Sequence, residues 1–344
     1  MNRREFLKVA SLFSTTPLFA KNDDRLFFKF PKKPLNYYHL KSKNAKFRVM
    51  LIGGIHGNEI GAYKAADMLI DSTIKKGELI IIPRSNFISI LANLRGYNGD
   101  MNRKFESISK KDPDYYYVEM LKSAILEFKP DVVISMHDGY GFRIKNSKAW
   151  GQSIVIDEIK YKDFNLFSEA NYIKNQANIY LKYKLALINT KTFSSHIHDE
   201  QKKALTGWCL NNGIKAYCIE ASKQLPSLED KIKTHLIMLR EFFKLYDIEI
   251  AEMDEMIKNP NKFLNTTFPL VKMKINNKIY TIHSSKKITL QKGSKIEIVS
   301  ISGARGSFAV PVGVNLNWGS FYARYLNINI KNDYETKFNI QIRS

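Results

Sequence analysis

Between residues 47 and 245, short stretches rich in β-branched and other apolar residues alternate with longer amphipathic stretches. Buried strands are predicted at residues 47–55, 78–83, 131–136 and 214–219. Apolar residues at helical spacing predict helices at residues 59–70 and 115–128, and from just after Pro226 to about residue 245. Strands that alternate with helices predict an α/β fold, with a mostly parallel mixed sheet flanked by helices.

The pattern changes after Asn259, Pro260 and Asn261, because no helical period is found beyond Phe268. Short alternating segments there predict strands at residues 271–275, 279–282, 287–290, 295–299 and 326–330. We therefore expect an α/β domain over residues 21–260, followed by a small all-β domain over residues 261–344. The second domain is expected to be barrel-like or sandwich-like.

The first twenty residues are typical of a twin-arginine export signal. Arg3 and Arg4 precede Phe6, Leu7 and Lys8, and a mildly apolar stretch ends at Ala20. That stretch is too short for a stable membrane anchor, and no run of eighteen apolar residues occurs elsewhere. The sequence therefore predicts a signal peptide at residues 1–20, a periplasmic location and no transmembrane anchor.

The chain carries a formal net charge of +21, which favours attraction to polyanions such as nucleic acid or an anionic cell-wall polymer. It has no basic helix with recognition spacing, no aromatic stacking motif and no Cys/His finger, so nucleic acid is not expected as a partner. Cys209 and Cys218 are the only cysteines. They exclude a four-cysteine zinc site, and leave open one disulfide or two buried thiols.

The first candidate site is the sequence His56-Gly-Asn-Glu59, which lies where a buried strand ends and a helix begins. A histidine in the loop and a glutamate in the first helical turn can converge on one ion. His137 follows another buried strand, at the edge of the sheet where sites in open α/β folds lie. His56, Glu59 and His137 are three ligands that leave a fourth position open, which is typical of a catalytic zinc site.

A second motif lies between these ligands and contains Arg95, Asp100, Asn102, Arg103 and Phe105. The order His-x-x-Glu, Asp-x-Asn-Arg-x-Phe and strand-end His resembles the zinc carboxypeptidase superfamily. The related succinylglutamate desuccinylase and aspartoacylase branch shares these motifs. The resemblance implies one Zn²⁺ per chain.

It also implies roles for the residues of this motif. Asn102 and Arg103 correspond to the pair that holds the substrate carboxylate, and Arg95 to the arginine at the scissile carbonyl oxygen. A guanidinium binds a carboxylate through two parallel hydrogen bonds, and a second fixed cation can stabilise an oxyanion. Glu220, at the end of an apolar strand, corresponds to the general base, and a carboxyl at such a position is costly unless it is paired or functional.

The spacing of the motifs and the all-β domain most resemble the D,L-carboxypeptidases that trim peptidoglycan tripeptides to dipeptides and determine helical cell shape. That resemblance implies cleavage between γ-D-glutamate and meso-diaminopimelate in muropeptides. It also implies that Trp150 and Thr206 line the pocket for the diaminopimelate tail. Some of these enzymes have Gln at the first ligand position, whereas this chain has His56.

Two alternatives remain open at this point. One is a deacylase of N-acyl amino acids that uses the same metal and arginines, although an export signal and an all-β domain do not favour it. The other is a non-catalytic protein that binds the cell wall. The complete set of candidate catalytic residues does not favour that alternative. The sequence does not identify a protein partner.

Overall fold

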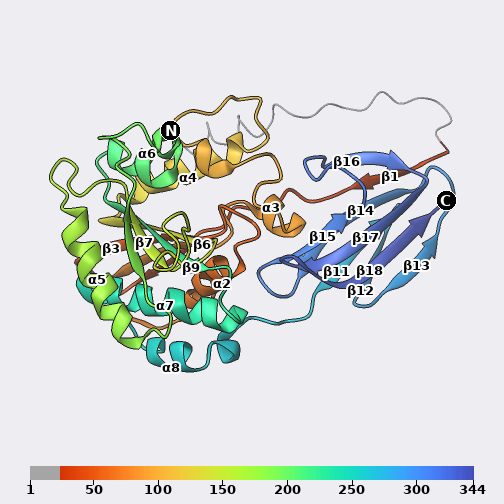
Figure 1. Ribbon diagram of the computed structural model, residues 1–344. Helices are drawn as coiled ribbons and strands as arrows, with labels where there is room; N and C mark the ends of the chain where they lie inside the picture. Colours follow the sequence, from red (N-terminus) through yellow and green to blue (C-terminus); the bar gives the residue numbers. More distant parts are fainter. Residues whose placement is uncertain (1–23) are drawn as a thin grey trace.

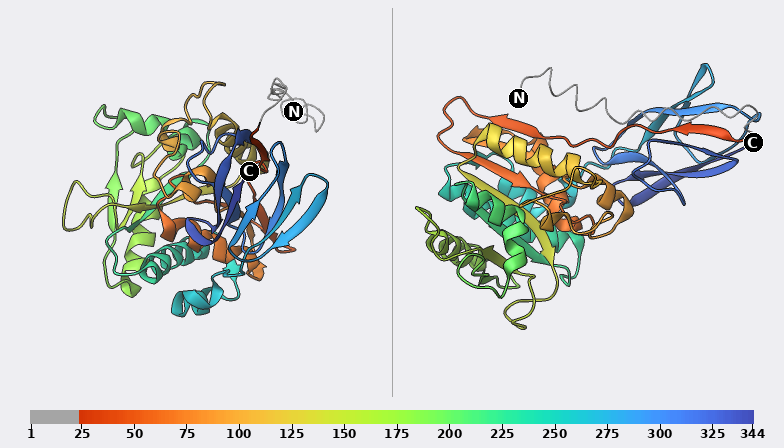
Figure 2. Two further views of the ribbon diagram at one scale, coloured as in Figure 1. Left: turned by 90° about the vertical axis from the view of Figure 1, so that its right-hand side faces the viewer. Right: turned by 90° about the horizontal axis from the view of Figure 1, so that it is seen from above.

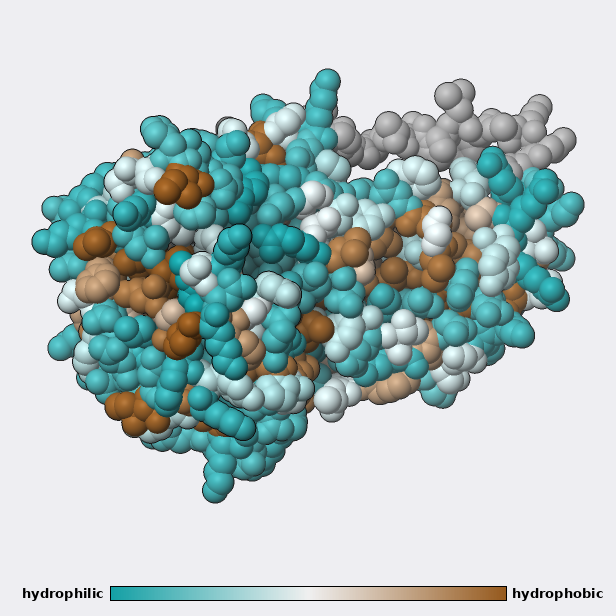
Figure 3. Space-filling model, viewed as in Figure 1, coloured by the Kyte–Doolittle hydropathy of each residue, from teal (hydrophilic) through white to brown (hydrophobic). Residues whose placement is uncertain are grey.

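The computed structural model describes residues 24–344, so the expected signal peptide at residues 1–20 lies outside the described part. Within that part the chain forms an α/β domain and a β-domain, which lie end to end (Figures 1 and 2). No helix among the described residues is both long and apolar enough to cross a bilayer. Hydrophilic side chains cover most of the face shown in Figure 3, which agrees with the excess of lysine and arginine.

A seven-stranded mixed sheet forms the centre of the α/β domain. In spatial order its strands are β2 (Tyr38–Lys41), β5 (Glu78–Ile82), β3 (Arg48–Ile52), β6 (Val132–Gly139), β9 (Ala216–Ser222), β7 (Ser153–Ile156) and β8 (Ala186–Asn189). The β3–β5, β3–β6, β6–β9 and β7–β8 pairs are parallel, whereas β2 runs antiparallel to β5 and β7 runs antiparallel to β9. This confirms the predicted mostly parallel sheet.

Helices cover both faces of this sheet because its central strands are apolar on both sides. In β3, Val49 and Leu51 face one core, whereas Met50 and Ile52 face the other. The first core is closed by α2 (Ile60–Met68), α5 (Leu166–Tyr180), α7 (Leu228–Leu245) and α8 (Met253–Lys258). The second is closed by α3 (Phe87–Ala92), α4 (Tyr115–Phe128) and α6 (Leu205–Asn211).

Shorter elements connect these layers. They are the 3₁₀ helices η1 (Leu69–Asp71), η2 (Met101–Arg103), η3 (Asp199–Lys203) and η4 (Pro260–Phe263), and the paired strands β4 (Ile74–Lys76) and β10 (Glu249–Ile250).

The β-domain is a sandwich of two sheets with its own apolar core. One sheet contains, in order, β12 (Lys278–Ile282), β11 (Leu270–Ile275), β14 (Lys295–Ser302), β1 (Leu26–Lys29) and β16 (Ser320–Ala323). The other contains β13 (Lys286–Thr289), β18 (Glu335–Arg343), β17 (Tyr325–Asn332) and β15 (Ser307–Pro311). Of the two architectures expected from the sequence, the structure has the sandwich.

The strand β1 corrects the expected domain boundary at residue 21. It pairs in parallel with β14 and antiparallel with β16, so the β-domain contains chain segments from both before and after the α/β domain. Leu26 and Phe28 are fully buried, and the ring of Phe28 stacks on Phe321 with centroids 5.7 Å apart. A four-residue strand whose partners lie so far along the chain leaves no local signal, and this explains the difference.

A buried ion-pair network joins the two domains. Arg84 of the α/β domain lies between Asp67, at 2.5 Å, and Asp333 of the β-domain, at 2.6 Å. Lys64 also contacts Asp333, and Arg305 of the β-domain contacts Asp67 at 2.9 Å. Because removing one member would leave an uncompensated buried charge, this network fixes the position of one domain relative to the other.

Candidate metal centre and active site

The three predicted metal ligands come from the carboxyl ends of two neighbouring strands. His56 lies in the loop after β3, Glu59 immediately precedes α2, and His137 lies within β6. Between the first two, a Cβ at Gly57 would lie 2.0 Å from a backbone atom of Ser89, so only glycine fits there. The strand β6 is longer than the sequence predicted, and its hydrogen bonding to β9 fixes His137 within the sheet.

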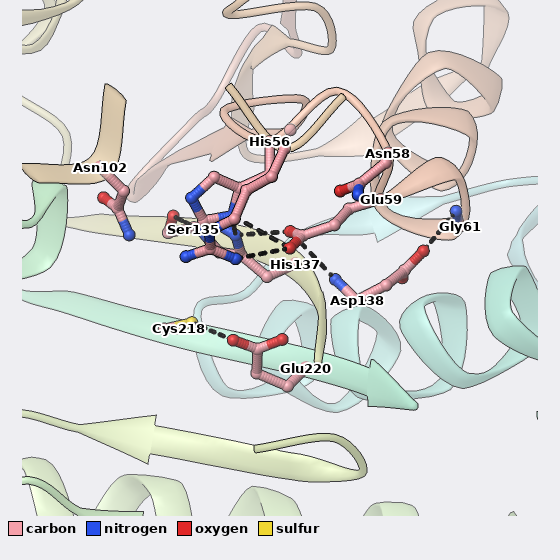
Figure 4. A network of polar contacts seen from close by, with 12 residues as sticks. His56, Asn58, Glu59, Gly61, Asn102, Ser135, His137, Asp138, Cys218 and Glu220 are labelled. Carbon is pink, nitrogen blue, oxygen red and sulfur yellow. Dashed lines mark hydrogen bonds and ion pairs between the residues drawn. The ribbon is translucent and has the colours of Figure 1, made fainter. Parts of the chain in front are cut away.

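The side chains of His56, Glu59 and His137 converge on one point (Figure 4). The two Nδ1 atoms are 3.0 Å apart. The Glu59 carboxylate lies 3.0 Å from Nδ1 of His56 and 2.8 Å from Nδ1 of His137. All three side chains are buried. Two imidazoles and a carboxylate with their ligand atoms this close fit a divalent metal ion, and the donor set is one that zinc adopts.

The outer nitrogen of each imidazole has a polar partner of its own. His56 Nε2 lies 2.9 Å from Asp100 Oδ1, and His137 Nε2 lies 2.9 Å from Ser135 Oγ. Such partners fix the orientation and tautomer of a ligand histidine and increase metal affinity. Both Nδ1 atoms are thereby directed at the same point.

The charge of Glu59 is compatible with a ligand role. Burial opposes ionisation of this carboxyl, but the adjacent His56 and His137 hold its pKa well below the usual range. Arg95 adds a further cation, with Nη1 lying 3.4 Å from Glu59 Oε1. The buried carboxylate is therefore ionised and available as a metal ligand.

Arg95 lies beside the cluster, where its half-exposed guanidinium also pairs with Asp100 at 3.0 Å. Asp100 is a junction, because it contacts both His56 and Arg95 and accepts a hydrogen bond from the backbone N–H of Asn102. This last bond caps η2, so Asp100 supports the loop that carries Asn102 and Arg103.

Asn102 and Arg103 lie in η2, next to the first turn of α6. Asn102 Oδ1 accepts a hydrogen bond of 3.0 Å from the backbone N–H of Leu205. The Arg103 guanidinium is partly exposed and donates to the backbone oxygen of Asn102. The structure thus brings this pair to the side of the cluster where α6 begins, and leaves part of the guanidinium open to solvent.

Glu220 lies on β9 opposite His137 in the parallel register with β6. It is 8% exposed, and its Oε2 has no hydrogen-bond partner within residues 24–344, whereas Oε1 lies 3.6 Å from Cys218 Sγ. Burial, reinforced by the charges of Glu59 and Asp138, raises the pKa of Glu220 well above its usual value. A buried carboxyl with an unpaired oxygen and a raised pKa is suited to accepting and returning a proton.

The two proposed pocket residues flank this region. Trp150 lies in the loop between β6 and β7, and its ring meets His198 edge-on at 6.1 Å. Its backbone lies against Gly139, close to Glu220. Thr206, in the first turn of α6, is buried and hydrogen-bonded to Asp157. The cysteines are free thiols, with Cys209 fully buried and Cys218 partly buried, so no disulfide joins them.

Three further residues support or border the site. Asp138 accepts a hydrogen bond from the backbone N–H of Gly61 and lies 2.9 Å from His235 Nε2, which connects β6 to α2 and α7. Lys223 lies 3.6 Å from Glu59 Oε1. For His235 and Lys223 no local motif indicates a role, because both reach the site only through tertiary packing.

The cluster of His56, Glu59 and His137 is the one group of metal-ligating side chains found across residues 24–344. His196 is exposed and pairs with Asp199 at 3.2 Å.

The model of one protein family matches residues 29–265, which cover the α/β domain. It describes the catalytic domain of the carboxypeptidase controlling helical cell shape. The chain belongs to this family. It is therefore a carboxypeptidase of the metallo-hydrolase kind, and the cluster of His56, Glu59 and His137 is compatible with its metal site. Among curated proteins, no match was found.

Solved structures agree with this assignment at the level of the fold. The tripeptide-bound cell shape determinant Csd4 from Helicobacter pylori has 20% sequence identity and a TM-score of 0.60, over 90% of this chain and 100% of that chain. The mDAP-bound form of H. pylori Csd4, a D,L-carboxypeptidase, has 21% identity and a TM-score of 0.58, over 89% and 99%. Both domains of this chain therefore have a counterpart.

Proposed function

We propose that the protein is a zinc-dependent D,L-carboxypeptidase of the periplasm that converts peptidoglycan tripeptides to dipeptides. The bond cleaved would join γ-D-glutamate to meso-diaminopimelate, and its loss would affect cell shape. The observation that carries the proposal is the convergence of two imidazoles and a carboxylate beside Arg95, Arg103 and the unpaired Oε2 of Glu220. Family membership and the tripeptide-bound relative support the choice of substrate.

Each group of polar side chains at the site would have a separate role in the reaction. Bound at His56, Glu59 and His137, a zinc ion would supply Lewis-acid chemistry to the scissile carbonyl. Asn102 and Arg103 would hold the terminal carboxylate, because a guanidinium matches that group in shape and charge. Arg95 would stabilise the negative charge that develops on the carbonyl oxygen.

Glu220 would move the proton. Its Oε2 would accept a proton from the attacking water as the new C–O bond forms, and would then donate it to the leaving amine nitrogen as the C–N bond breaks. The raised pKa of Glu220 suits both halves of this transfer. The products are a dipeptide carboxylate and free diaminopimelate.

Export to the periplasm through residues 1–20 is part of the proposal, because peptidoglycan is located there and Arg3 and Arg4 belong to the expected export signal. Fusing residues 1–20 to a reporter that acts only after export would test this part. Substituting Lys for both arginines should retain the reporter in the cytoplasm.

The activity is tested by incubating zinc-loaded protein with defined tri-, tetra- and pentapeptide muropeptides and identifying the released amino acid by mass. We expect diaminopimelate to be released from the tripeptide but not from the tetrapeptide or the pentapeptide. After the metal is removed by a chelator, no amino acid should be released. Release of an acyl group from N-acyl amino acids, with muropeptides left intact, would favour the deacylase instead.

A further inference from the structure

Lys223 places an ammonium group beside the metal ligands, and no role in the reaction described above uses it. It follows the last residue of β9, and its backbone N–H donates to the backbone oxygen of Gly139 at the end of β6. Its Nζ lies 3.3 Å from Asn58 Oδ1 and 3.6 Å from Glu59 Oε1. The side chain is 29% exposed, so a substrate group can reach it.

The side of the centre on which Lys223 lies is informative. Figure 4 shows Asn58 and Asn102 on opposite sides of the histidine cluster. Lys223 contacts Asn58, whereas Asn102 and Arg103 lie next to α6. A peptide whose terminal carboxylate is held by Arg103 crosses the cluster, so the acyl part that remains after cleavage lies on the side of Lys223.

The chemistry of that acyl part determines what the ammonium would meet. A glutamyl residue linked through its γ-carbonyl retains a free α-carboxylate, which an ordinary α-linked peptide lacks. A cation close to the scissile carbonyl on the acyl side is complementary to that carboxylate. Arg95 is also close, but it is the group placed to meet the carbonyl oxygen.

We propose that Lys223 binds the free α-carboxylate of the γ-linked glutamyl residue and so selects γ-glutamyl over uncharged acyl groups. This rests on the proposed function, because it concerns the same site and substrate class. Once Glu59 ligates a metal ion, its negative charge is shared with that ion, and the ammonium of Lys223 is left to pair with substrate.

The experiment compares two tripeptides of nearly equal shape, one with γ-D-glutamate and one with D-isoglutamine, in which an amide replaces the α-carboxylate. Wild-type protein should cleave the first with kcat/KM about tenfold higher, which corresponds to one charge-assisted hydrogen bond. Lys223→Gln should abolish that preference by slowing only the charged substrate, and Lys223→Arg should largely retain it. Lys233→Gln is the matched control, since Lys233 has a similar exposure of 33% but pairs with Glu229 on α7.

Several outcomes would overturn the assignment. If Lys223→Gln lowers kcat/KM equally for both tripeptides, Lys223 acts through Glu59 rather than on substrate. If Lys223→Gln still prefers the γ-D-glutamate tripeptide as strongly as wild type does, Lys223 does not bind the α-carboxylate. Binding of the dipeptide product, measured by calorimetry with metal content checked, separates the two hypotheses. If the dipeptide binds less tightly to Lys223→Gln while wild type releases no diaminopimelate, the proposed function fails but the carboxylate site stands.

Discussion

Asn98, three residues after Arg95, exchanges two side-chain hydrogen bonds with Asn317 of the β-domain, at 2.9 and 3.3 Å. Next to this pair, the backbone N–H of Leu316 donates to the hydroxyl of Tyr97 at 3.1 Å. The loop that carries Arg95 is therefore attached to the β-domain as well as to its own domain. We therefore expect the sandwich to help position Arg95, the arginine proposed to stabilise the oxyanion.

Replacing Asn317 with Ala should lower kcat by up to about tenfold with little change in KM, because a small displacement of Arg95 weakens oxyanion stabilisation more than substrate binding. In an Arg95→Ala background the same change should have no further effect. Steady-state kinetics of the four proteins measure this coupling. Asn277→Ala, at an exposed turn of the β-domain, is the control, and additive losses would contradict the mechanism.

Replacing Glu220 with Gln should lower kcat about 10²–10⁴-fold, because the amide cannot accept the proton from water. Metal content should remain at one ion per chain, since Glu220 is not among the three clustered ligands. Turnover on tripeptide and metal analysis of the same sample test both points. Wild-type turnover in this variant would exclude Glu220 as the base.

Replacing Asp100 with Asn should weaken metal binding about 10–100-fold, because Asp100 orients the His56 imidazole through Nε2. Competition with a chelator measures the affinity. Ser135→Ala is a matched comparison on the other histidine, and should have a smaller effect because Ser135 is uncharged. An unchanged affinity in Asp100→Asn would show that the loop alone orients His56.

Replacing Gly139 with Ala should reduce activity at least tenfold, because the new Cβ would lie 2.8 Å from Glu220 Oε2 and 2.6 Å from the backbone nitrogen of Gly151. The Glu220 carboxyl must then leave the position that it has in the structure. Gly319→Ala introduces the same methyl group where no atom lies within 4 Å, and should behave as wild type. Equal activity of the two variants would contradict the placement of Glu220.

Replacing Asp333 with Asn should destabilise the protein by about 3–5 kcal/mol at pH 7, because Arg84 loses one of its two buried counter-charges and Lys64 loses its partner. Arg84 and Lys64 hold the pKa of Asp333 below its unfolded value, so the carboxylate stabilises the fold at neutral pH and this contribution is lost as the pH falls below about 4. Wild type should therefore lose stability more steeply on acidification than the variant.

Urea unfolding at several pH values measures both effects. Asp71→Asn is the control, since Asp71 pairs with Arg305 at the surface and is 68% exposed. It should change the free energy of unfolding by less than about 1 kcal/mol. Parallel pH profiles for wild type and Asp333→Asn would contradict the proposed role of the network.

The sequence by itself determined the α/β class, the strand ends that carry the ligands and the identity of the family. Periodicity predicts α4 at the residues it occupies, because apolar spacing is a local property that packing preserves. His56, Glu59 and His137 could be selected because each is adjacent to an apolar strand or helix start. Their motifs are short, and histidine and glutamate are residue types that commonly bind metal ions.

Tertiary structure decided what depends on contacts between distant residues. The membership of β1 in the β-domain, the Asn98 to Asn317 bonds and the position of Lys223 all join segments far apart in the chain. No periodicity or spacing records such pairings, because they arise only when the separate elements pack. The unpaired oxygen of Glu220 is also a feature that only the tertiary structure decided, since β9 carries Glu220 between β6 and β7.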